Sequence, residues 1–452
     1  MKTFRFKKLL QNTSWLNNIE ITVDETGIIT SINELANTTN CIGYAIPGLQ
    51  NAHSHAFQYA MAGIAENHNT KNTQDDFWSW RAAMYKLALS INPDELEIIA
   101  TMLYSEMLRN GYTSVAEFHY LHNDKDGNKY NNLAQMSESL INAAKNTGIN
   151  ITLIPIFYQM GGFGQKPYEN QKRFINKTIN DYLKLLDSTK KTCNLYNNAN
   201  LALGVHSLRA VESSDIIELS KINKDKLPFH LHISEQKKEI EDSINFLGQR
   251  PVSWLSENIN LNDNYHLVHA THLDDREIIN ISKSKANIVI CPSTEGNLGD
   301  GIFPFKKFSS LNWSIGTDSH ISLNPMEEIR ILDYGQRLTS HNRNTFATKK
   351  NGNSGLSALN SITKAGRKAM GNNNSDFFKI GQALNALVIS DKHPLISTTN
   401  NNNLLNTIIY SSDVSMYEGT IANGSWRVKN GLIQDQKIYS IFNKVISKLK
   451  NR

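Results

Sequence analysis

Two histidines separated by a single residue, His53 and His55, form the most informative pair in this sequence. Side chains alternate between the two faces of a β-strand, so residues two apart project from the same face. Both imidazoles can therefore bind one metal ion. The pair is a weak signal by itself, because a chain with 14 His residues can contain this spacing by chance.

Residues of similar chemistry follow later in the chain, each at or just after the end of a short apolar run that is typical of a strand. They are His206, His232, Glu235, His269 and Asp318. Three imidazoles and one carboxylate suit Zn²⁺ or Fe²⁺ and leave a coordination position for water. The expected metal ligands are His53, His55, His232 and Asp318. Because a metal lowers the pKa of its bound water to about 7, the set predicts a hydrolase that uses one divalent metal ion, with Zn²⁺ preferred and Fe²⁺ as the alternative.

Glu235, His269 and Asp318 are the expected catalytic residues. Glu235 lies three residues after His232, where a carboxyl can take a proton from the attacking water and pass it to a leaving nitrogen. The alternative role for Glu235 is to cap the start of a helix. His269 can polarise or deprotonate the water together with Asp318. His230 projects to the same side as His232 but one layer deeper, so we expect it to be buried and not a ligand.

Two arginines and a tyrosine follow the same strand candidates. Arg81 comes after the first, Tyr120 after the second and Arg209 after the fourth. The guanidinium fork matches the geometry of a carboxylate. A single exposed arginine is more often a surface residue, but two at the mouth of one pocket predict an anionic substrate.

The elements that must position these residues are strands that alternate with helices. The strand candidates are Ala45–His53, Ser114–His119, Ile151–Phe157, Leu201–His206, Pro228–Ile233, His266–Ala270, Asn287–Cys291 and Trp313–Gly316. Between them lie helical patterns such as Pro93–Asn110, which starts with an N-cap residue and a proline. Eight such strands predict an α/β fold with a (β/α)₈ TIM-like barrel, in which catalytic groups collect at the carboxyl ends of the strands.

Strand-like patterns also occur on both sides of the predicted barrel. They are Ile19–Val23 and Ile28–Ile32 near the N-terminus, and Ala386–Ser390, Leu405–Tyr410 and Gly424–Lys429 near the C-terminus; an amphipathic helix is expected over Lys437–Arg452. We expect the terminal strands to pair in a small β-sandwich domain. The expected division is residues 1–45 and 371–452 for that domain and 46–370 for the catalytic barrel.

Composition narrows the class of protein. A hydrophobic fraction of 40% supports a large core, and no apolar run approaches the length of a membrane-spanning helix. The net charge of +5 is spread over 452 residues without an aromatic-interleaved basic stripe, which argues against nucleic-acid binding. Three cysteines and no secretory signal pattern favour a cytoplasmic protein without a disulfide framework.

Several blocks spread over most of the chain carry a resemblance to a known family. They are His53–Gln58 with Met61–Gly63, Trp80–Arg81, Glu117–Tyr120, His206–Val211, His232–Gln236, Cys291–Gly301, and Asp318–His320 with Tyr334–Arg337. They resemble the amidohydrolase superfamily and, within it, the N-formimino-L-glutamate deiminase (formimidoylglutamate deiminase) family of bacterial histidine degradation. The last two blocks are more specific than the general features of the superfamily.

The resemblance implies hydrolysis of a C=N carbon through a tetrahedral intermediate, with loss of ammonia to leave N-formyl-L-glutamate. It implies one divalent metal, usually zinc, on the four ligands given above, and catalytic roles for Glu235 and His269. The residues implied to hold the dicarboxylate substrate are Gln58, Arg81, Tyr120, His206 and Arg209. A homodimer is also implied.

The sequence departs from the family at a few positions, and other functions compete. Tyr59 stands where Arg is expected and Val205 where Pro is expected, so either could alter the edge of the pocket. The main alternative is a deaminase of a purine or another cyclic amidine, which would share the metal set; Arg81 and Arg209 argue against an uncharged heterocycle. A hydrolytic dehalogenase is a further variant. A non-catalytic scaffold would be expected to lack ligands, and none is missing.

Overall fold

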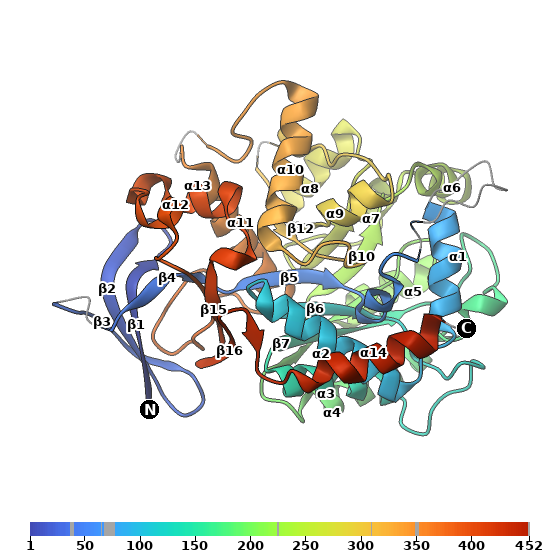
Figure 1. Cartoon of the computed structure of the whole chain (residues 1–452). Coiled ribbons are helices and arrows are strands. Elements are labelled where there is room, and N and C mark those ends of the chain that lie inside the picture. Colours follow the sequence, from blue (N-terminus) through green and yellow to red (C-terminus); the bar gives the residue numbers. More distant parts are fainter. Residues whose placement is uncertain are drawn as a thin grey trace.

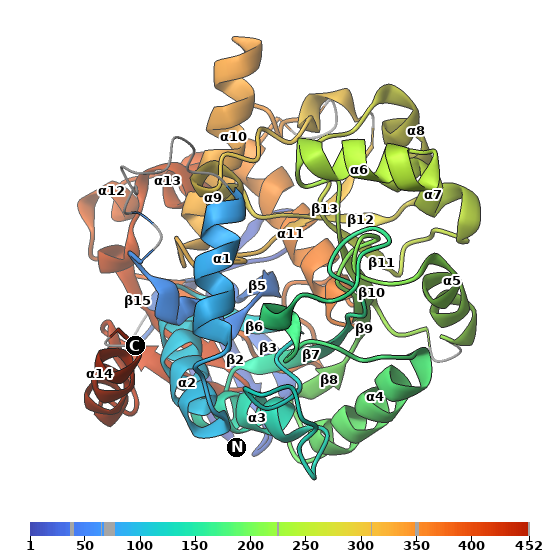
Figure 2. The same ribbon diagram turned by 90° about the vertical axis from the view of Figure 1, so that its right-hand side faces the viewer.

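The computed structural model describes residues 1–36, 40–64, 66, 77–223, 226–308, 310–348 and 352–450. Within these ranges the chain forms a barrel of parallel strands surrounded by helices, with a separate sheet beside it (Figures 1 and 2). Both chain ends contribute to the separate sheet. This arrangement confirms the predicted fold class.

The barrel strands follow one another in sequence order around the ring. They are β5 (Leu49–Ser54), β6 (Tyr112–His119), β7 (Asn150–Phe157), β9 (Leu203–Val205), β10 (Phe229–Ile233), β11 (Tyr265–His269), β12 (Asn287–Ile290) and β13 (Asn312–Ile315), while the short β8 (Ala199–Leu201) pairs with β7 off this path. Each coincides with a strand candidate. The ring closes between β13 and β5, where the N–H groups of Thr317 and Asp318 donate to His53 O at 3.1 and 3.0 Å. Two expected metal ligands therefore lie at the closure of the barrel.

The first strand candidate, Ala45–His53, is divided between the two sheets. Its first part belongs to β4 (Ile42–Pro47) in the separate sheet, and its second part is β5 of the barrel. The chain crosses at Gly48, whose N–H donates to Asn385 O at 3.0 Å. A Cβ there would lie 2.4 Å from the side chain of Thr113, so a larger residue would push the two sheets apart.

Helices lie around the barrel, and α1 (Phe77–Ala88) lies over the end at which a cavity opens (Figure 2). The others are α2 (Pro93–Arg109), α3 (Gln135–Thr147), α4 (Ile179–Cys193), α5 (Ser213–Ile222), α6 (Lys237–Leu247), α7 (Pro251–Asn258), α8 (Asp275–Ser284), α9 (Pro292–Asn297), α10 (Pro325–Ser340) and α11 (Ser354–Ala369). The predicted helix Pro93–Asn110 is α2, and the side chain of Asn92 caps it by accepting from Glu95 N. In the described part of the chain, no helix is both long and apolar enough to cross a membrane.

The separate sheet joins the two chain ends through β4 and β14. Its order is β17-β16-β15-β14-β4-β1-β2-β3, and the strands not yet given are β1 (Lys2–Leu10), β2 (Trp15–Val23), β3 (Ile29–Glu34), β14 (Ala386–Ile389), β15 (Tyr417–Ala422), β16 (Ser425–Lys429) and β17 (Leu432–Ile433). Hydrogen bonds run through all of these strands as one path. Since β4 pairs with β1 and β14, we propose that the small domain extends on its N-terminal side as far as Pro47.

One C-terminal strand prediction is wrong. Leu405–Tyr410 lies in helix α13 (Asn401–Ser411), which follows the short α12 (Pro394–Ser397). Asn400 caps α13 by accepting from Asn403 N, and the buried Leu404, Leu405, Ile408 and Ile409 follow helical spacing. The predicted terminal helix is α14 (Lys437–Lys450), which packs against α2 (Figure 1) through a hydrogen bond from Arg109 to Tyr439 OH.

Candidate active site

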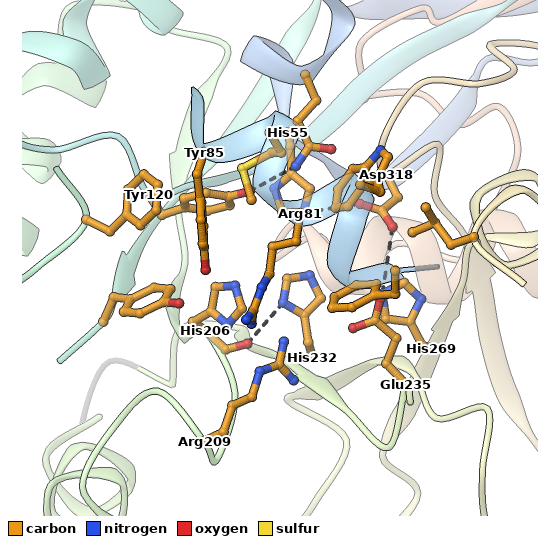
Figure 3. Close-up of a pocket in the computed structure, with 17 residues that line it drawn as sticks. His55, Arg81, Tyr85, Tyr120, His206, Arg209, His232, Glu235, His269 and Asp318 are labelled. Atoms are coloured by element: carbon orange, nitrogen blue, oxygen red, sulfur yellow. Dashed lines mark hydrogen bonds and ion pairs between the residues drawn. The ribbon is translucent and has the colours of Figure 1, made fainter. Parts of the chain in front are cut away.

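A cavity opens at the carboxyl ends of the barrel strands. Every site residue predicted from the sequence lines this cavity except His53. His53 is fully buried behind the cavity wall, in contact with His55. Figure 3 shows that these side chains come from separate strands and loops and point into one space. The barrel thus brings together residues that lie up to about 260 positions apart in the chain.

The expected metal ligands form a tight, buried cluster. His53 Nε2 lies 3.1 Å from His55 Nε2 and 3.0 Å from His232 Nε2. Asp318 Oδ1 lies 3.2 Å from His55 Nε2 and 3.6 Å from His53 Nε2. Burial lowers the pKa of His53 and of His232 well below the ordinary value, which favours the neutral imidazoles that metals bind.

The hydrogen bonds of Nδ1 in His55 and His232 determine which ring nitrogen of each residue faces the cluster. His55 Nδ1 donates to Phe118 O at 2.9 Å, and His232 Nδ1 donates to His206 O at 3.0 Å. A carbonyl oxygen only accepts, so both Nδ1 atoms carry the proton and both Nε2 atoms present lone pairs to the cluster. Lone pairs that converge beside a carboxylate fit a divalent cation.

Glu117 anchors the loop that carries His55. Its carboxyl accepts from Ser54 Oγ at 2.7 Å and from Ala56 N at 2.6 Å. The sequence placed Glu117 in a family block without assigning it a role. The structure shows that it holds the segment on both sides of His55.

Several residues at the strand ends have a left-handed backbone. The φ angles are 54° at Ser234, 67° at His269 and 46° at Asp318. Such angles are uncommon for residues other than glycine and are concentrated at functional sites. Here they direct the residues at the ends of β10, β11 and β13 toward a common point.

Glu235 and His269 lie beside the cluster of expected metal ligands. His269 Nε2 is 3.7 Å from Glu235 Oε1 and 3.7 Å from Asp318 Oδ2. Burial raises the pKa of Glu235 above its ordinary value. Burial also lowers the pKa of His269, but Glu235, Glu295 and Asp318 outweigh it and raise that pKa to about 10. His269 can therefore carry a proton near neutral pH, and the raised pKa of Glu235 favours its protonated form compared with an exposed carboxyl.

The alternative role of Glu235 as a helix cap is not observed. Helix α6 starts without a side-chain cap, and Glu239 Oε2 instead accepts from the backbone N–H of Glu235 at 3.0 Å. The Glu235 carboxyl is left free to face the cavity.

Glu295 is a contributor to the site that sequence reasoning missed. Its Oε1 accepts from His269 Nδ1 at 3.3 Å and from Cys291 N at 2.9 Å. The contact orients the ring so that Nε2 faces Glu235 and Asp318. The only signal was its place in the family block Cys291–Gly301.

Replacing Glu295 by Gln is expected to lower kcat about 10-fold or more with little change in KM, because partners that orient a functional histidine typically contribute about 10- to 100-fold. Glu328→Gln is the matched control: Glu328 is also fully buried and binds Ser293 Oγ at 2.6 Å. Burial raises the pKa of Glu328 to about 8, so an amide resembles its protonated form. Steady-state kinetics would show a role for Glu295 if only its variant loses kcat; equal effects would reject that role.

Two arginines line the same cavity as the metal cluster, and Figure 3 shows their head groups converging near His206. The Arg81 guanidinium lies over the rings of Trp78 and Tyr85, 4.3 and 5.6 Å from their centroids. Arg209 Nη1 lies 3.6 Å from Glu239 Oε2. Both arginines therefore place a positive charge at the cavity.

The remaining predicted binding residues form one wall of the cavity. Gln58 Nε2 donates to Tyr120 OH at 2.9 Å, and the Tyr120 and His206 rings lie 5.7 Å apart. Neither departure from the family changes this wall: Tyr59 packs near Phe442 and Val205 is buried within β9, and the cavity lining includes neither.

Three comparisons with known proteins all find amidohydrolases. Residues 44–427 match the model of the Amidohydrolase family. Formimidoylglutamate deiminase of Pseudomonas aeruginosa is 37% identical over 431 residues, which is 94% of each chain. The crystal structure of an amidohydrolase from Brucella melitensis covers the whole of both chains with a TM-score of 0.93 and 33% identity.

A more distant structure shares the fold. An adenosine deaminase from Xanthomonas campestris with bound zinc has a TM-score of 0.81 over 100% of this chain and 98% of its own, at 17% identity. At that identity the likeness shows the fold alone.

Proposed function

The chain belongs to the amidohydrolase family, and we propose that it hydrolyses N-formimino-L-glutamate to N-formyl-L-glutamate and ammonia in histidine degradation. The observation that carries this proposal is the presence of Arg81 and Arg209 in the same cavity as the metal cluster and Glu235. The name of the Pseudomonas relative, which matches over 94% of this chain, supports it.

We propose that His53, His55, His232 and Asp318 hold one divalent metal ion, with Zn²⁺ as first candidate and Fe²⁺ as the alternative. Imidazole and carboxylate ligands suit both ions. When bound, such an ion acts as a Lewis acid and makes hydroxide available near neutral pH. The zinc in the Xanthomonas structure is consistent with this assignment.

The residues around the cluster supply the proton transfers. Glu235 takes a proton from the attacking water and delivers it to the nitrogen that leaves as ammonia. His269, held by Glu295, and Asp318 orient and polarise the water on the other side. Since Glu235 and His269 are buried, these protons are exchanged with little competition from bulk water.

The two arginines distinguish this substrate from an uncharged heterocycle. We propose that they bind the two carboxylates of the glutamate part, while Gln58, Tyr120 and His206 contact the rest of the substrate. Arg209 already has Glu239 as a partner, but a purine would offer no anion to Arg81, which has no carboxylate within ion-pair distance among the described residues.

Arg81→Met and Arg209→Ala are each expected to raise KM about 10- to 100-fold, since hydrogen bonds to charged groups contribute about 1.5–3 kcal/mol. Metal content should change far less. Arg209→Ala should also lower the free energy of unfolding by about 3 kcal/mol, because it leaves the buried Glu239 without its cation. Kinetics, metal analysis and chemical denaturation would check this; metal loss that parallels the rise in KM would remove Arg209 from the binding role.

Ammonia release by the zinc-loaded protein tests the proposed function. N-formimino-L-glutamate should be turned over rapidly to N-formylglutamate, while guanine and adenosine should not react. Turnover of a purine alone would refute the substrate assignment and preserve the metal site. A metal-loaded protein without any of these activities would favour the scaffold alternative.

We also propose that the protein is a cytoplasmic homodimer without a nucleic-acid partner. The dimer is tested by the mass in solution, for which the chain mass is 51.0 kDa.

A further inference from the structure

A buried glutamine connects two tyrosines in the wall of the cavity. Gln171 lies in the short 3₁₀ helix η2 (Glu169–Gln171) and is fully buried. Its Nε2 donates to Tyr85 OH and to Tyr158 OH, each at 3.0 Å. Both tyrosines line the cavity together with the two arginines.

The orientation of the Gln171 amide is determined by its other contact. Gln171 Oε1 accepts from the backbone N–H of Tyr168 at 2.8 Å. A backbone N–H only donates, so the oxygen must face Tyr168 and the NH₂ group must face the phenols. Both phenol oxygens therefore act as acceptors toward Gln171.

Each phenol also has one proton to donate. Both hydroxyls contact the same Gln171 nitrogen, and at most one of them can donate to the other. At least one proton then lacks an acceptor among the described residues. Burial raises the pKa of Tyr158 well above its ordinary value, so its hydroxyl keeps this proton.

The free hydroxyl lies in a positively charged part of the cavity. Arg209 and Arg81 both act electrostatically on Tyr158, and Figure 3 shows Tyr85 extending toward the space between His206 and Arg81. Among the described residues no carboxylate lies within ion-pair distance of Arg81. The cavity therefore places a hydroxyl donor beside an arginine that has no anionic partner. This combination suits a carboxylate ligand.

We propose that Tyr85 and Tyr158, oriented by Gln171, form a hydroxyl pair that donates to a substrate carboxylate beside Arg81 and Arg209 and so contributes to selection of a dicarboxylate. This inference rests on the proposed function and adds three residues to its site. The tyrosines are binding residues, and Gln171 is a positioning residue.

Single substitutions test the pair. Tyr85→Phe and Tyr158→Phe should each raise KM for N-formimino-L-glutamate several-fold to about 100-fold, with kcat changed much less. Gln171→Glu should act in the same direction, since its carboxylate still accepts from Tyr168 N but now also accepts the phenol protons. Tyr182→Phe is the matched control, because Tyr182 OH is buried against Pro155 O at 3.0 Å and lies outside the cavity; its KM should stay within about twofold of wild type.

Two analogues identify the carboxylate. N-formimino-L-norvaline lacks the side-chain carboxylate, and N-formimino-4-aminobutanoate lacks the α-carboxylate. The penalty of each Tyr→Phe change should largely disappear for one analogue and persist for the other. A penalty that persists for both analogues would indicate a structural role and overturn the inference.

The outcomes separate this inference from the proposed function. If wild type turns over N-formimino-L-glutamate and both Tyr→Phe variants match it, the function stands and the inference fails. If wild type does not turn it over, the binding of glutarate to wild type and to the four variants is measured by calorimetry. Weaker binding only in the Tyr85, Tyr158 and Gln171 variants supports a carboxylate subsite. Equal binding by all proteins, or no binding, overturns it.

Discussion

Replacing Glu235 by Gln is expected to lower kcat by about 10²- to 10⁴-fold, the range contributed by a positioned general acid–base. The amide has nearly the same shape but cannot accept the proton of the attacking water or deliver one to the leaving nitrogen. Glu235 does not contact the cluster formed by His53, His55 and His232 directly, so the variant should bind metal like wild type.

The same variant should still bind its substrate. The arginines proposed to hold the carboxylates are unchanged, so the dissociation constant of N-formimino-L-glutamate, measured by calorimetry on the slow variant, should lie close to the wild-type KM. Single-turnover kinetics and metal analysis complete the test. A kcat within tenfold of wild type, or a loss of metal in proportion to activity, would remove Glu235 from the proton-transfer role.

Removing the metal is expected to lower activity by about 10³-fold or more, because a Lewis acid contributes several kcal/mol to the transition state and each 1.36 kcal/mol corresponds to a factor of ten. Dialysis against a chelator should abolish turnover, and added Zn²⁺ should restore it. The metal-loaded protein should also unfold at a higher temperature, since an ion that binds only the folded chain stabilises it.

A pair of histidines on β10 makes this test specific. His232→Ala should lose most of the bound metal and the activity with it. His230→Ala should keep the metal, because His230 is buried two residues earlier and its Nε2 contacts Ala369 O at 2.8 Å. Some loss of stability is expected from both. Equal retention of metal by the two variants would refute the proposed ligand set, and metal loss from His230→Ala alone would reverse the assignment.

The order of the barrel strands could be predicted from the sequence for a local physical reason. Parallel barrel strands are buried on both faces and therefore appear as short, nearly continuous apolar runs. His232 lies near the end of such a run and Asp318 lies shortly after one, so their position at the carboxyl end required no knowledge of the rest of the chain. The proposed metal-ligand set followed from residue type and from this placement, and the structure places His53 Nε2 about 3 Å from the Nε2 atoms of His55 and His232.

The local sequence pattern gave wrong predictions where the same apolar segment is compatible with more than one structure. Leu405–Tyr410 is apolar enough for a strand, and its helical state depends on the Asn400 cap and on packing of one face. Similarly, Ala45–His53 is a single apolar run, but Gly48 lets the chain pass from one sheet to the other.

The sequence by itself determined the fold class, the set of histidines and carboxylates proposed to bind metal, and the presence of two arginines after barrel strands, because each depends on residue type and on spacing within one element. Only the tertiary structure decided which groups orient them. Glu295 meets His269 from α9, Glu239 meets Arg209 from α6, and Gln171 meets Tyr85 across 86 positions. Such contacts join separate elements, and their partners are selected by the closure of the barrel, which no local pattern encodes.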